Sequence, residues 1–243
     1  MLFVVLAVKV ASEENTVKIP ISWGFDPAGN LKYDDVIMSD SDPSPAALAP
    51  KTNRGELTRQ KILDAAEREI GQKGFAEASV SAITAEAAVA QGTFYLYFRN
   101  KEDVLRELVL RMGRRLRRHL TLAIADANSR LEAERAGLLA FLEFARANPN
   151  LYRVVEESQF VDPSVYHRYY DDFARNYRSA LIAAEGTGEI RPGNAEIRAW
   201  ALMGLAVMLG HRYGIWDTSV PLKPIADAAF DMIAVGLERR DDA

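Results

Sequence analysis

From Gly55 onward, apolar residues recur along the chain at the spacing of helices rather than of strands. The first predicted helix carries four apolar residues on one face: Ile62, Leu63, Ala66 and Ile70. Gly71 and Gly74 then mark its end. No stretch after residue 55 alternates apolar and polar residues as a half-buried strand does. The pattern predicts an all-α fold with about nine helices.

Two short helices are predicted next, over 81–88 and 91–98, with Ser79 placed to cap the first. Asn100 and Asp103 then have the spacing of a capping box and open a long helix. Its buried side is predicted to carry Val104, Leu105, Leu108, Met112 and Leu116. Its outer side is predicted to carry most of Arg111, Arg114, Arg115, Arg117 and Arg118. Further helices are predicted over 129–148, 151–160, 164–185, 195–213 and 224–239.

The first 52 residues form an N-terminal extension of different composition. MLFVVLAVKV is too short for a membrane span, which needs roughly 20 apolar residues, and lacks the basic start and cleavage site of a signal peptide. We expect a short strand or a sticky tail there. ISWGFDPAGN and SDSDPSPAALAP indicate turn and linker, so residues 1–52 are expected to be largely disordered, 36–52 most of all. An incorrectly assigned start codon is an alternative explanation of the extension.

Charge is unevenly distributed along the 243 residues, whose formal net charge is −4. Residues 51–120 hold 14 basic and 9 acidic side chains, a net charge of +5, between two acidic segments. Such local asymmetry indicates a partner better than the net charge does, although a solvated helix face explains it equally well. The absence of cysteine fits a reducing cytoplasm and excludes disulfides and thiolate metal sites.

The sequence contains no motif that indicates an enzyme. The three histidines are scattered, and no metal-ligand spacing, nucleophile elbow or phosphate loop occurs. Gly186-Thr187-Gly188 follows a predicted helix and indicates a loop. His167 and Asp171 are four residues apart, but a solvated pair is the simpler explanation. We therefore expect neither an enzyme nor a cofactor or metal.

The stretch QGTFYLYFRNKEDVL concentrates aromatic residues at the second of the two short helices. Phe94 and Phe98 are four residues apart and share a core-facing side. Gln91, Thr93, Tyr95 and Tyr97 are left to point elsewhere. Two short helices joined by a tight turn, with polar and aromatic groups on the outer face of the second, predict a helix-turn-helix at about residues 79–98. For each tyrosine, packing against the first helix is an equal alternative.

LTRQKILDAAEREIGQKGF and SVSAITAEAAVAQGTFYLYFRNKEDVL together resemble the DNA-binding domain of the TetR family of bacterial transcriptional regulators. The resemblance covers roughly residues 56–116 and includes the family's G-T-x-Y-x-Y-F run followed by K-E. The rest of the chain matches only in length and helicity. The resemblance implies a DNA-binding domain over 53–103 and a ligand-binding and dimerisation domain over 104–243. It also implies control of transcription, by repression as the family default.

Carried over position by position, the resemblance implies DNA contacts by Arg54, Arg59, Ser79, Ser81, Gln91, Gly92, Thr93, Tyr95, Tyr97 and Lys101. Gln91, Gly92 and Thr93 would lie near base edges, and Tyr95 and Tyr97 near phosphate or thymine methyl groups. The remaining five would contact the DNA backbone, with Lys101 as a phosphate clamp.

The turn departs from the family pattern A-G-V-S, because here it reads Ala87-Ala88-Val89-Ala90. Glycine permits a positive φ in the turn, so alanine there is expected to cost about 1 kcal/mol. Serine would cap the next helix, and its replacement by Ala90 is expected to cost another ~1 kcal/mol. These departures motivate an alternative hypothesis: a helical ligand-binding or protein-interaction module that has lost specific DNA binding.

The stretch AWALMGLAVMLG, residues 199–210, is apolar all round, so it must be covered on every side. It is too short to cross a membrane, and we expect no membrane partner. Its small residues Ala199, Ala201, Gly204 and Ala206 would let another helix approach closely. With Ile225, Ala229, Ile233 and Leu237 it predicts a four-helix homodimer interface; burial within one subunit is the alternative. Two-fold pairing would also double the DNA site that is read.

The middle helices are rich in large side chains, which suits a pocket for an apolar effector. The pocket residues predicted are Phe144, Tyr152, Phe160, Tyr169, Phe173, Trp200, Met203 and Arg178. Arg153, Arg175 and His211 are further candidate anchors for an anionic group. FLEFARANPNLYRVVEE resembles family members that respond to fatty or aromatic acyl thioesters. Ligand binding is expected to displace the long helix after residue 100 and release the DNA.

Overall fold

The computed structural model describes residues 24–25, 31–32 and 52–237 and divides the chain into two units, 1–44 and 45–243. In the first unit, β1 (Gly24–Phe25) pairs antiparallel with β2 (Leu31–Lys32). This pairing falls partly within the stretch predicted as turn and linker. MLFVVLAVKV and, apart from these two strands, the rest of the extension up to residue 51 lie outside the described residues.

The second unit is helical, which confirms the predicted fold class. Its elements are α1 (Asn53–Lys73), α2 (Val80–Glu86), α3 (Gln91–Phe94), α4 (Lys101–Ala123), α5 (Arg130–Ala147), α6 (Pro149–Val161), α7 (Pro163–Gly186), α8 (Ala195–Leu209), the π-helical η2 (Gly210–Trp216) and α9 (Leu222–Leu237). Most boundaries lie within three residues of the prediction. Two segments differ: α3 ends four residues early, and the helix predicted over 195–213 changes at Gly210 from α- to π-helical winding.

Side-chain caps fix where the helices begin. Ser79 accepts a hydrogen bond from the backbone N–H of Ala82 (3.1 Å), and Asn100 accepts one from that of Asp103 (2.8 Å), as predicted. The reciprocal arm of the expected capping box is shifted by one residue, because Asp103 accepts from the N–H of Arg99 rather than from that of Asn100 (3.2 Å). The register of α4 is therefore set within its first turn.

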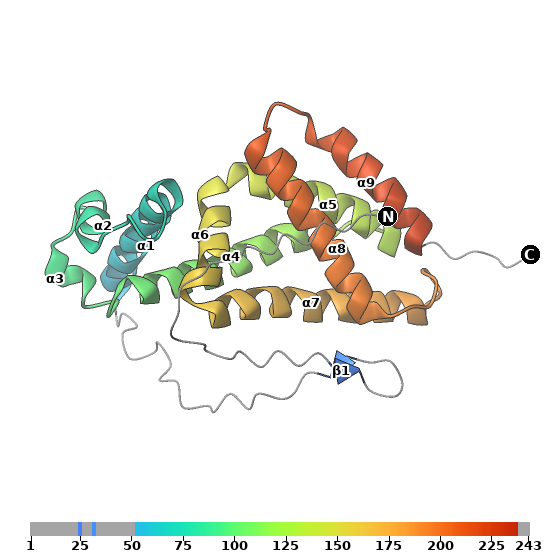
Figure 1. Ribbon diagram of the computed structural model, residues 1–243, viewed down its shortest axis with the longest axis horizontal. Coiled ribbons are helices and arrows are strands. Elements are labelled where there is room, and N and C mark those ends of the chain that lie inside the picture. The colour runs from blue at the N-terminus through green and yellow to red at the C-terminus, as the bar shows by residue number, and fades with distance from the viewer. Residues whose placement is uncertain (1–23, 26–30, 33–51, 238–243) are drawn as a thin grey trace, which may run out of the picture. The chain divides into compact units, whose positions relative to one another are not determined.

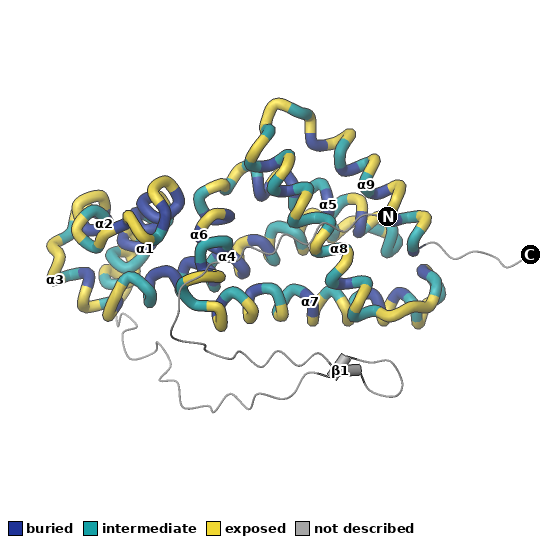
Figure 2. The backbone as a smooth tube through the Cα atoms, in the orientation of Figure 1, coloured by how far each residue is buried: buried dark blue, intermediate teal, exposed yellow. Residues whose placement is uncertain are grey.

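Two hydrophobic cores hold the helices together. The first core runs without interruption from α1, α2 and α3 through α4 to α5, α6 and α7. The second core joins α5, α7, α8 and α9 and the loop after α7. Figure 1 shows α1, α2 and α3 gathered at one end of α4, with the other helices along its remaining length. Figure 2 shows the buried stripe that α4 presents between them.

The buried side of α4 is the predicted one, and Val109 and Gly113 also belong to it. Of the arginines placed outside, Arg114, Arg115 and Arg118 are exposed, whereas Arg111 and Arg117 are half-buried. The helical period allows this, because both lie at the edge of the buried stripe, where a long side chain can cover apolar surface.

The turn between α2 and α3 carries the strain that the sequence indicated. Ala88 has φ +54°, and it alone among the described non-glycine residues has a positive φ. Ala90, the N-cap residue of α3, makes no side-chain capping hydrogen bond. A residue with a Cβ atom costs about 1–2 kcal/mol in the left-handed region. The helix-turn-helix is therefore built on a backbone that glycine would fit better.

We predict that Ala88→Gly raises the free energy of unfolding by about 0.5–1 kcal/mol. Relief of the left-handed strain outweighs the extra entropy that glycine gives the unfolded chain. Urea denaturation followed by circular dichroism measures the change.

Ala85→Gly is the matched control, since Ala85 is an exposed residue inside α2. There glycine is expected to destabilise by about 0.5–1 kcal/mol. Equal losses in both variants would contradict the assignment of strain to Ala88.

Candidate DNA-binding surface and effector cavity

The outer face of α3 presents polar groups on a fixed apolar base. Phe94 and Phe98 are buried in the first core, with ring centroids 5.6 Å apart. Gln91 and Gly92 are exposed, and no atom lies within 4 Å of a Cβ built on Gly92. Tyr95 is 50% exposed and stands edge-on to Phe94. The short helix therefore offers its first turn and Tyr95 to a partner.

Of five other predicted DNA contacts, two are half-buried and three are exposed. Tyr97 is half-buried against the first core, and Thr93 is half-buried beside it. Ser79 and Ser81 are exposed at the start of α2. The Ser79 oxygen accepts the capping hydrogen bond, so its hydroxyl proton is still available to a phosphate oxygen. Arg54 is exposed in the first turn of α1.

Arg59 and Lys101, the remaining predicted backbone contacts, are engaged within the protein. Arg59 forms ion pairs with Glu107 (3.3 Å) and Glu56 (3.8 Å). The Lys101 ammonium donates to the carbonyls of Phe75 and Ala78, the latter at 2.7 Å, and so ties the start of α4 to the segment after α1. Contact with DNA by either side chain would compete with these bonds.

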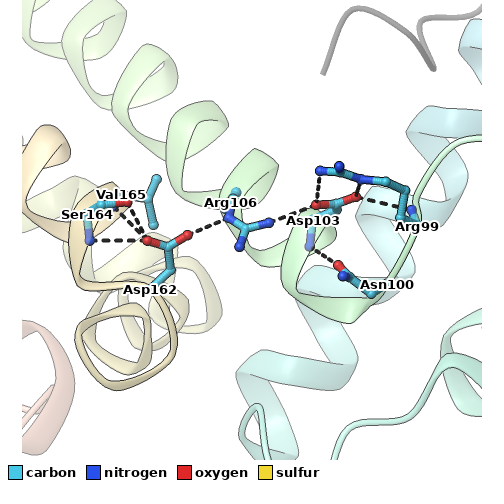
Figure 3. A network of polar contacts seen from close by, with 7 residues as sticks. All are labelled: Arg99, Asn100, Asp103, Arg106, Asp162, Ser164 and Val165. Carbon is cyan, nitrogen blue, oxygen red and sulfur yellow. Dashed lines mark hydrogen bonds and ion pairs between the residues drawn. The ribbon is translucent and has the colours of Figure 1, made fainter. Parts of the chain in front are cut away.

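A chain of charged groups links the start of α4 to the start of α7 (Figure 3). Asp103 accepts from the guanidinium of Arg99 (2.7 and 2.9 Å) and from that of Arg106 (2.8 Å). Arg106 also donates from Nε to Asp162. Asp162 in turn caps α7, accepting from the N–H groups of Ser164 (3.1 Å) and Val165 (3.2 Å). The Asp162 carboxylate thus caps the start of α7 and also binds Arg106 of α4.

These contacts lower the pKa of both carboxyl groups below the ordinary value of 3.8. For Asp103 the largest cause is the hydrogen bonding from Arg99. For Asp162, burial by itself would raise the pKa, but the bonds from Ser164, Arg106 and Val165 outweigh it. The ionised forms are therefore stabilised by folding.

A second link joins α1 to α6. The Glu157 carboxylate accepts from the backbone N–H of Phe75, and Arg153 donates to the carbonyl of Gln72 (3.0 Å). A Cβ on Gly71 would lie 2.3 Å from the Cβ of Asn150, so glycine is required for this close approach. The helix-turn-helix is thereby attached to α6 as well as to α4.

An apolar cavity of about 340 Å³ lies among α4, α5, α7, α8 and α9. Its wall draws Leu116, Leu120 and Phe173 from α4 and α7, and Leu138 and Ile233 from α5 and α9. Those residues belong partly to the first core and partly to the second. The cavity therefore separates the two cores, and its size is that of a small-molecule site.

Of the eight predicted pocket residues, Tyr169, Phe173 and Met203 line this cavity. The other five lie elsewhere. Phe144 packs on His119, and Tyr152 donates to the Val207 carbonyl (3.1 Å). Phe160 is 84% exposed, while Trp200 and Arg178 both contact Glu196. The further anchor candidates Arg153, Arg175 and His211 pair with Glu157, Asp172 and Glu156.

Polar residues of the cavity wall were missed by the sequence reasoning. Glu134, 5% exposed, accepts from Arg130 (2.8 Å) and from the Tyr177 hydroxyl. Burial, and then the charge of Glu134, raise the pKa of Tyr177 well above its ordinary range. Arg117 also lines the cavity. The i, i+4 spacing of Arg130 and Glu134 was the available signal, whereas nothing local distinguishes Arg117 from Arg118.

Exposed apolar residues recur along one face of α8 and along one face of α9, and together they are called the apolar seam. On α8 it consists of Ile197, Ala201, Gly204 and Met208, and on α9 of Ala228, Met232 and Val235. The expected interface residues Ile225, Ala229, Ile233 and Leu237 instead pack on the second core of their own subunit, and Ala199 is buried there too. Ala201 and Gly204 are exposed, whereas the packing of the four α9 residues agrees with the alternative, burial within one subunit.

Residues 62–108 match the family model of bacterial regulatory proteins, tetR family. A segment of 45 residues is 51% identical to the fatty acid metabolism regulator protein of Bacillus subtilis (strain 168), covering 18% of this chain and only 23% of that relative. The HTH-type transcriptional regulator BetI of Yersinia pestis (strain Pestoides F) is 27% identical over 165 residues, 59% of this chain and 82% of BetI. Over residues 62–108 the chain therefore matches the TetR family.

The fold agrees with that assignment. The transcriptional regulator FadR from Bacillus subtilis, solved in complex with stearoyl-CoA, matches with a TM-score of 0.65 and 22% identity, covering 73% of this chain and 98% of FadR. At this identity the likeness establishes a shared fold alone. These relatives are transcriptional regulators rather than enzymes. Within 52–237, no helix has the length and apolar content to cross a membrane.

We predict that Asp162→Ala lowers the free energy of unfolding by about 1–2 kcal/mol at neutral pH, through loss of the α7 cap and of the pair with Arg106. Because its pKa is depressed, the stabilisation by Asp162 is present above the ordinary value of 3.8 and lost as the pH falls below it. Asp162→Asn should therefore weaken the loss of stability on acidification below about pH 4. Urea titrations at a series of pH values measure both.

Asp172→Ala serves as the control, because Asp172 lies inside α7 and pairs only with the exposed Arg175 in the described structure. Its effect is expected to stay within about 0.5 kcal/mol. A loss as large as that of Asp162→Ala would show that the capping contact is not special.

Proposed function

We propose that this TetR-family protein is a ligand-responsive transcriptional regulator, a repressor that binds double-stranded operator DNA as a homodimer in the cytoplasm. The observation that supports it best is the start of α3, where Gln91, Gly92 and Tyr95 are exposed on a helix fixed by Phe94 and Phe98. A rigid base with open polar groups suits insertion into a major groove. The match of residues 62–108 to the family model supports the same surface.

Release by an effector is proposed to act through the helices that line the cavity. A ligand that separates the two cores would move α7 or α4, both of which contribute to the wall. Movement of α7 would reach Arg106 through Asp162, and movement of α6 would reach α1 through Arg153 and Glu157. Only a ligand with different affinities for the two arrangements shifts the equilibrium. The proposed boundary between the two domains, at residues 103 and 104, would then lie close to the contacts that change when the effector binds.

The effector is proposed to be an apolar or acyl molecule. The cavity wall is formed mainly by aliphatic and aromatic side chains, among them Leu116, Phe141 and Phe173. The stearoyl-CoA complex of the structurally similar FadR supports an acyl class. Tyr169 and Met203 are retained as proposed contacts, and the five predicted residues that lie elsewhere are left out.

The homodimer is proposed to form through the apolar seam of α8 and α9. Exposed apolar residues recur along α8 at steps of four and three, so they form a seam rather than isolated positions. Ala201 and Gly204 in the middle of the seam leave room for a partner helix. Two-fold pairing would place one α3 in each half-site of the operator.

We predict that Gln91→Ala weakens operator binding about ten- to a hundredfold, since one side-chain contact to a base is worth about 1–3 kcal/mol. Fluorescence anisotropy with a labelled fragment from upstream of the gene, with excess unrelated DNA as competitor, measures the Kd. If that fragment shows no specific binding, selection from random DNA supplies the site.

Gln159→Ala is the matched control, an exposed glutamine on α6 far along the chain from α3. It is expected to leave the Kd unchanged. If neither the upstream fragment nor selected DNA binds the unmutated protein specifically, the interaction-module hypothesis replaces the regulator, and the turn at Ala88 and Ala90 becomes its explanation.

We also predict that Met232→Glu converts the homodimer to monomers at micromolar concentration, because it places a charge in the apolar seam. Sedimentation velocity measures the molecular mass. Phe160→Glu changes an exposed aromatic residue outside the seam and is expected to leave the dimer intact. A dimer that survives Met232→Glu would place the interface elsewhere.

A further inference from the structure

The wall of the cavity carries one positive charge that no lining carboxylate balances. Its ionisable acidic and basic side chains, apart from tyrosines, are Arg117, Arg130 and Glu134. Arg130 and Glu134 are paired with each other, and the Tyr177 hydroxyl satisfies the second oxygen of Glu134. Arg117 is therefore left as the uncompensated cation of a mainly apolar wall.

Arg117 differs in this respect from its neighbours on α4. Arg106, Arg111, Arg114 and Arg115 each form an ion pair, with Asp162, Asp64, Glu107 and Glu67. For Arg117 no hydrogen bond or ion pair occurs among the described residues; its guanidinium lies 5.3 Å from the centroid of the Phe173 ring. Arg118 likewise lacks such a partner there, but it is exposed to water, whereas Arg117 is half-buried.

Glu156 of α6 does not balance the charge of Arg117, because it contacts other groups. Glu156 faces the Tyr170 hydroxyl (3.4 Å) and the imidazole of His211 (3.6 Å), and it is not part of the cavity wall. A cation that is partly removed from water gains from an anionic partner, and the gain is larger in an apolar enclosure than at the surface. The ring of Phe173 supplies only a weak substitute.

We propose that the effector is an amphipathic anion, an apolar body that fills the cavity and ends in a carboxylate bound by Arg117. A guanidinium matches a carboxylate in a planar, two-point arrangement. The aliphatic and aromatic wall suits an alkyl chain, so fatty acids are the ligand class that combines both features. This inference rests on the proposed function only in calling the ligand an effector, because its binding can be measured without DNA.

The experiment compares probes that differ only in their head group. Octanoate, decanoate and dodecanoate are titrated into the full chain by isothermal calorimetry, together with decanol and decyltrimethylammonium as uncharged and cationic partners of decanoate. Decanoate is expected to bind more tightly than decanol by about tenfold or more, and the cation least tightly; octanoate and dodecanoate report the chain length that the cavity prefers.

Arg117→Gln is expected to weaken carboxylate binding about ten- to a hundredfold while changing decanol binding little, and Arg117→Lys to restore part of the loss. Arg118→Gln removes an equal charge from the adjacent exposed position and is expected to change neither. Circular dichroism on each variant verifies folding.

Equal affinities for decanoate and decanol would overturn the proposal. So would no binding of any carboxylate at millimolar concentration, or equal losses in Arg117→Gln and Arg118→Gln. Operator binding of the ligand-free protein is measured separately, so a protein that binds decanoate through Arg117 but no DNA would refute the proposed function and leave this inference standing.

Discussion

The apolar face of α4 is the constraint on which the rest of the structure depends. Its first half, around Val104, Leu105 and Leu108, belongs to the core that positions α1, α2 and α3. Its last two turns, from Leu116 to Thr121, form part of the cavity wall together with Ile124 just after the helix. A helix of 23 residues spans about 34 Å. Because packed cores resist continuous deformation, a displacement at one end of such a helix is carried to the other.

The polar contacts around α4 play a different part from its core. Arg106 is 43% exposed, so its pair with Asp162 is worth no more than about 1 kcal/mol. Ligand binding can therefore exchange this pair for other contacts at small cost. The apolar contacts at Leu105 and Leu108, both fully buried, cannot be exchanged so cheaply. The buried apolar contacts thus hold α4 rigidly in place, whereas the ion pair between Arg106 and Asp162 is weak enough to be broken at small cost.

Much of the fold followed from local sequence signals, because helix starts, ends and faces depend on near neighbours. Ser79, Asn100 and Gly74 mark boundaries through hydrogen bonds within a few residues, and those boundaries are as predicted. The strain at Ala88 was also foreseeable, since a tight turn between two helices needs a left-handed residue.

The cavity could not be predicted in the same way, because its wall is assembled from five helices. Phe160 has every compositional property of a pocket residue and is exposed, whereas Arg117 has the properties of a surface residue and lines the wall. The exposed face of α9 was missed for a related reason. Both faces of that helix are apolar, so the sequence pattern does not say which one packs on the subunit's own core.

The charge of the helix-turn-helix segment has a consequence for how it would hold DNA. The net charge of +5 over residues 51–120 indicated a basic surface, but Arg59, Arg68 and Arg111 are paired with acidic residues of the same segment. The face around α3 instead offers hydroxyls at Ser79, Ser81 and Tyr95 and the N–H groups at the start of α2.

Contacts of that kind position a protein on phosphates through hydrogen bonds and release few counterions. Arg54 and Lys61 are exposed cations of α1 that add a limited ionic contribution. Affinity for DNA would then depend more on groove contacts and on two-fold pairing than on charge. In the proposed homodimer, the spacing between the two copies of α3 would then be the quantity that an effector has to change.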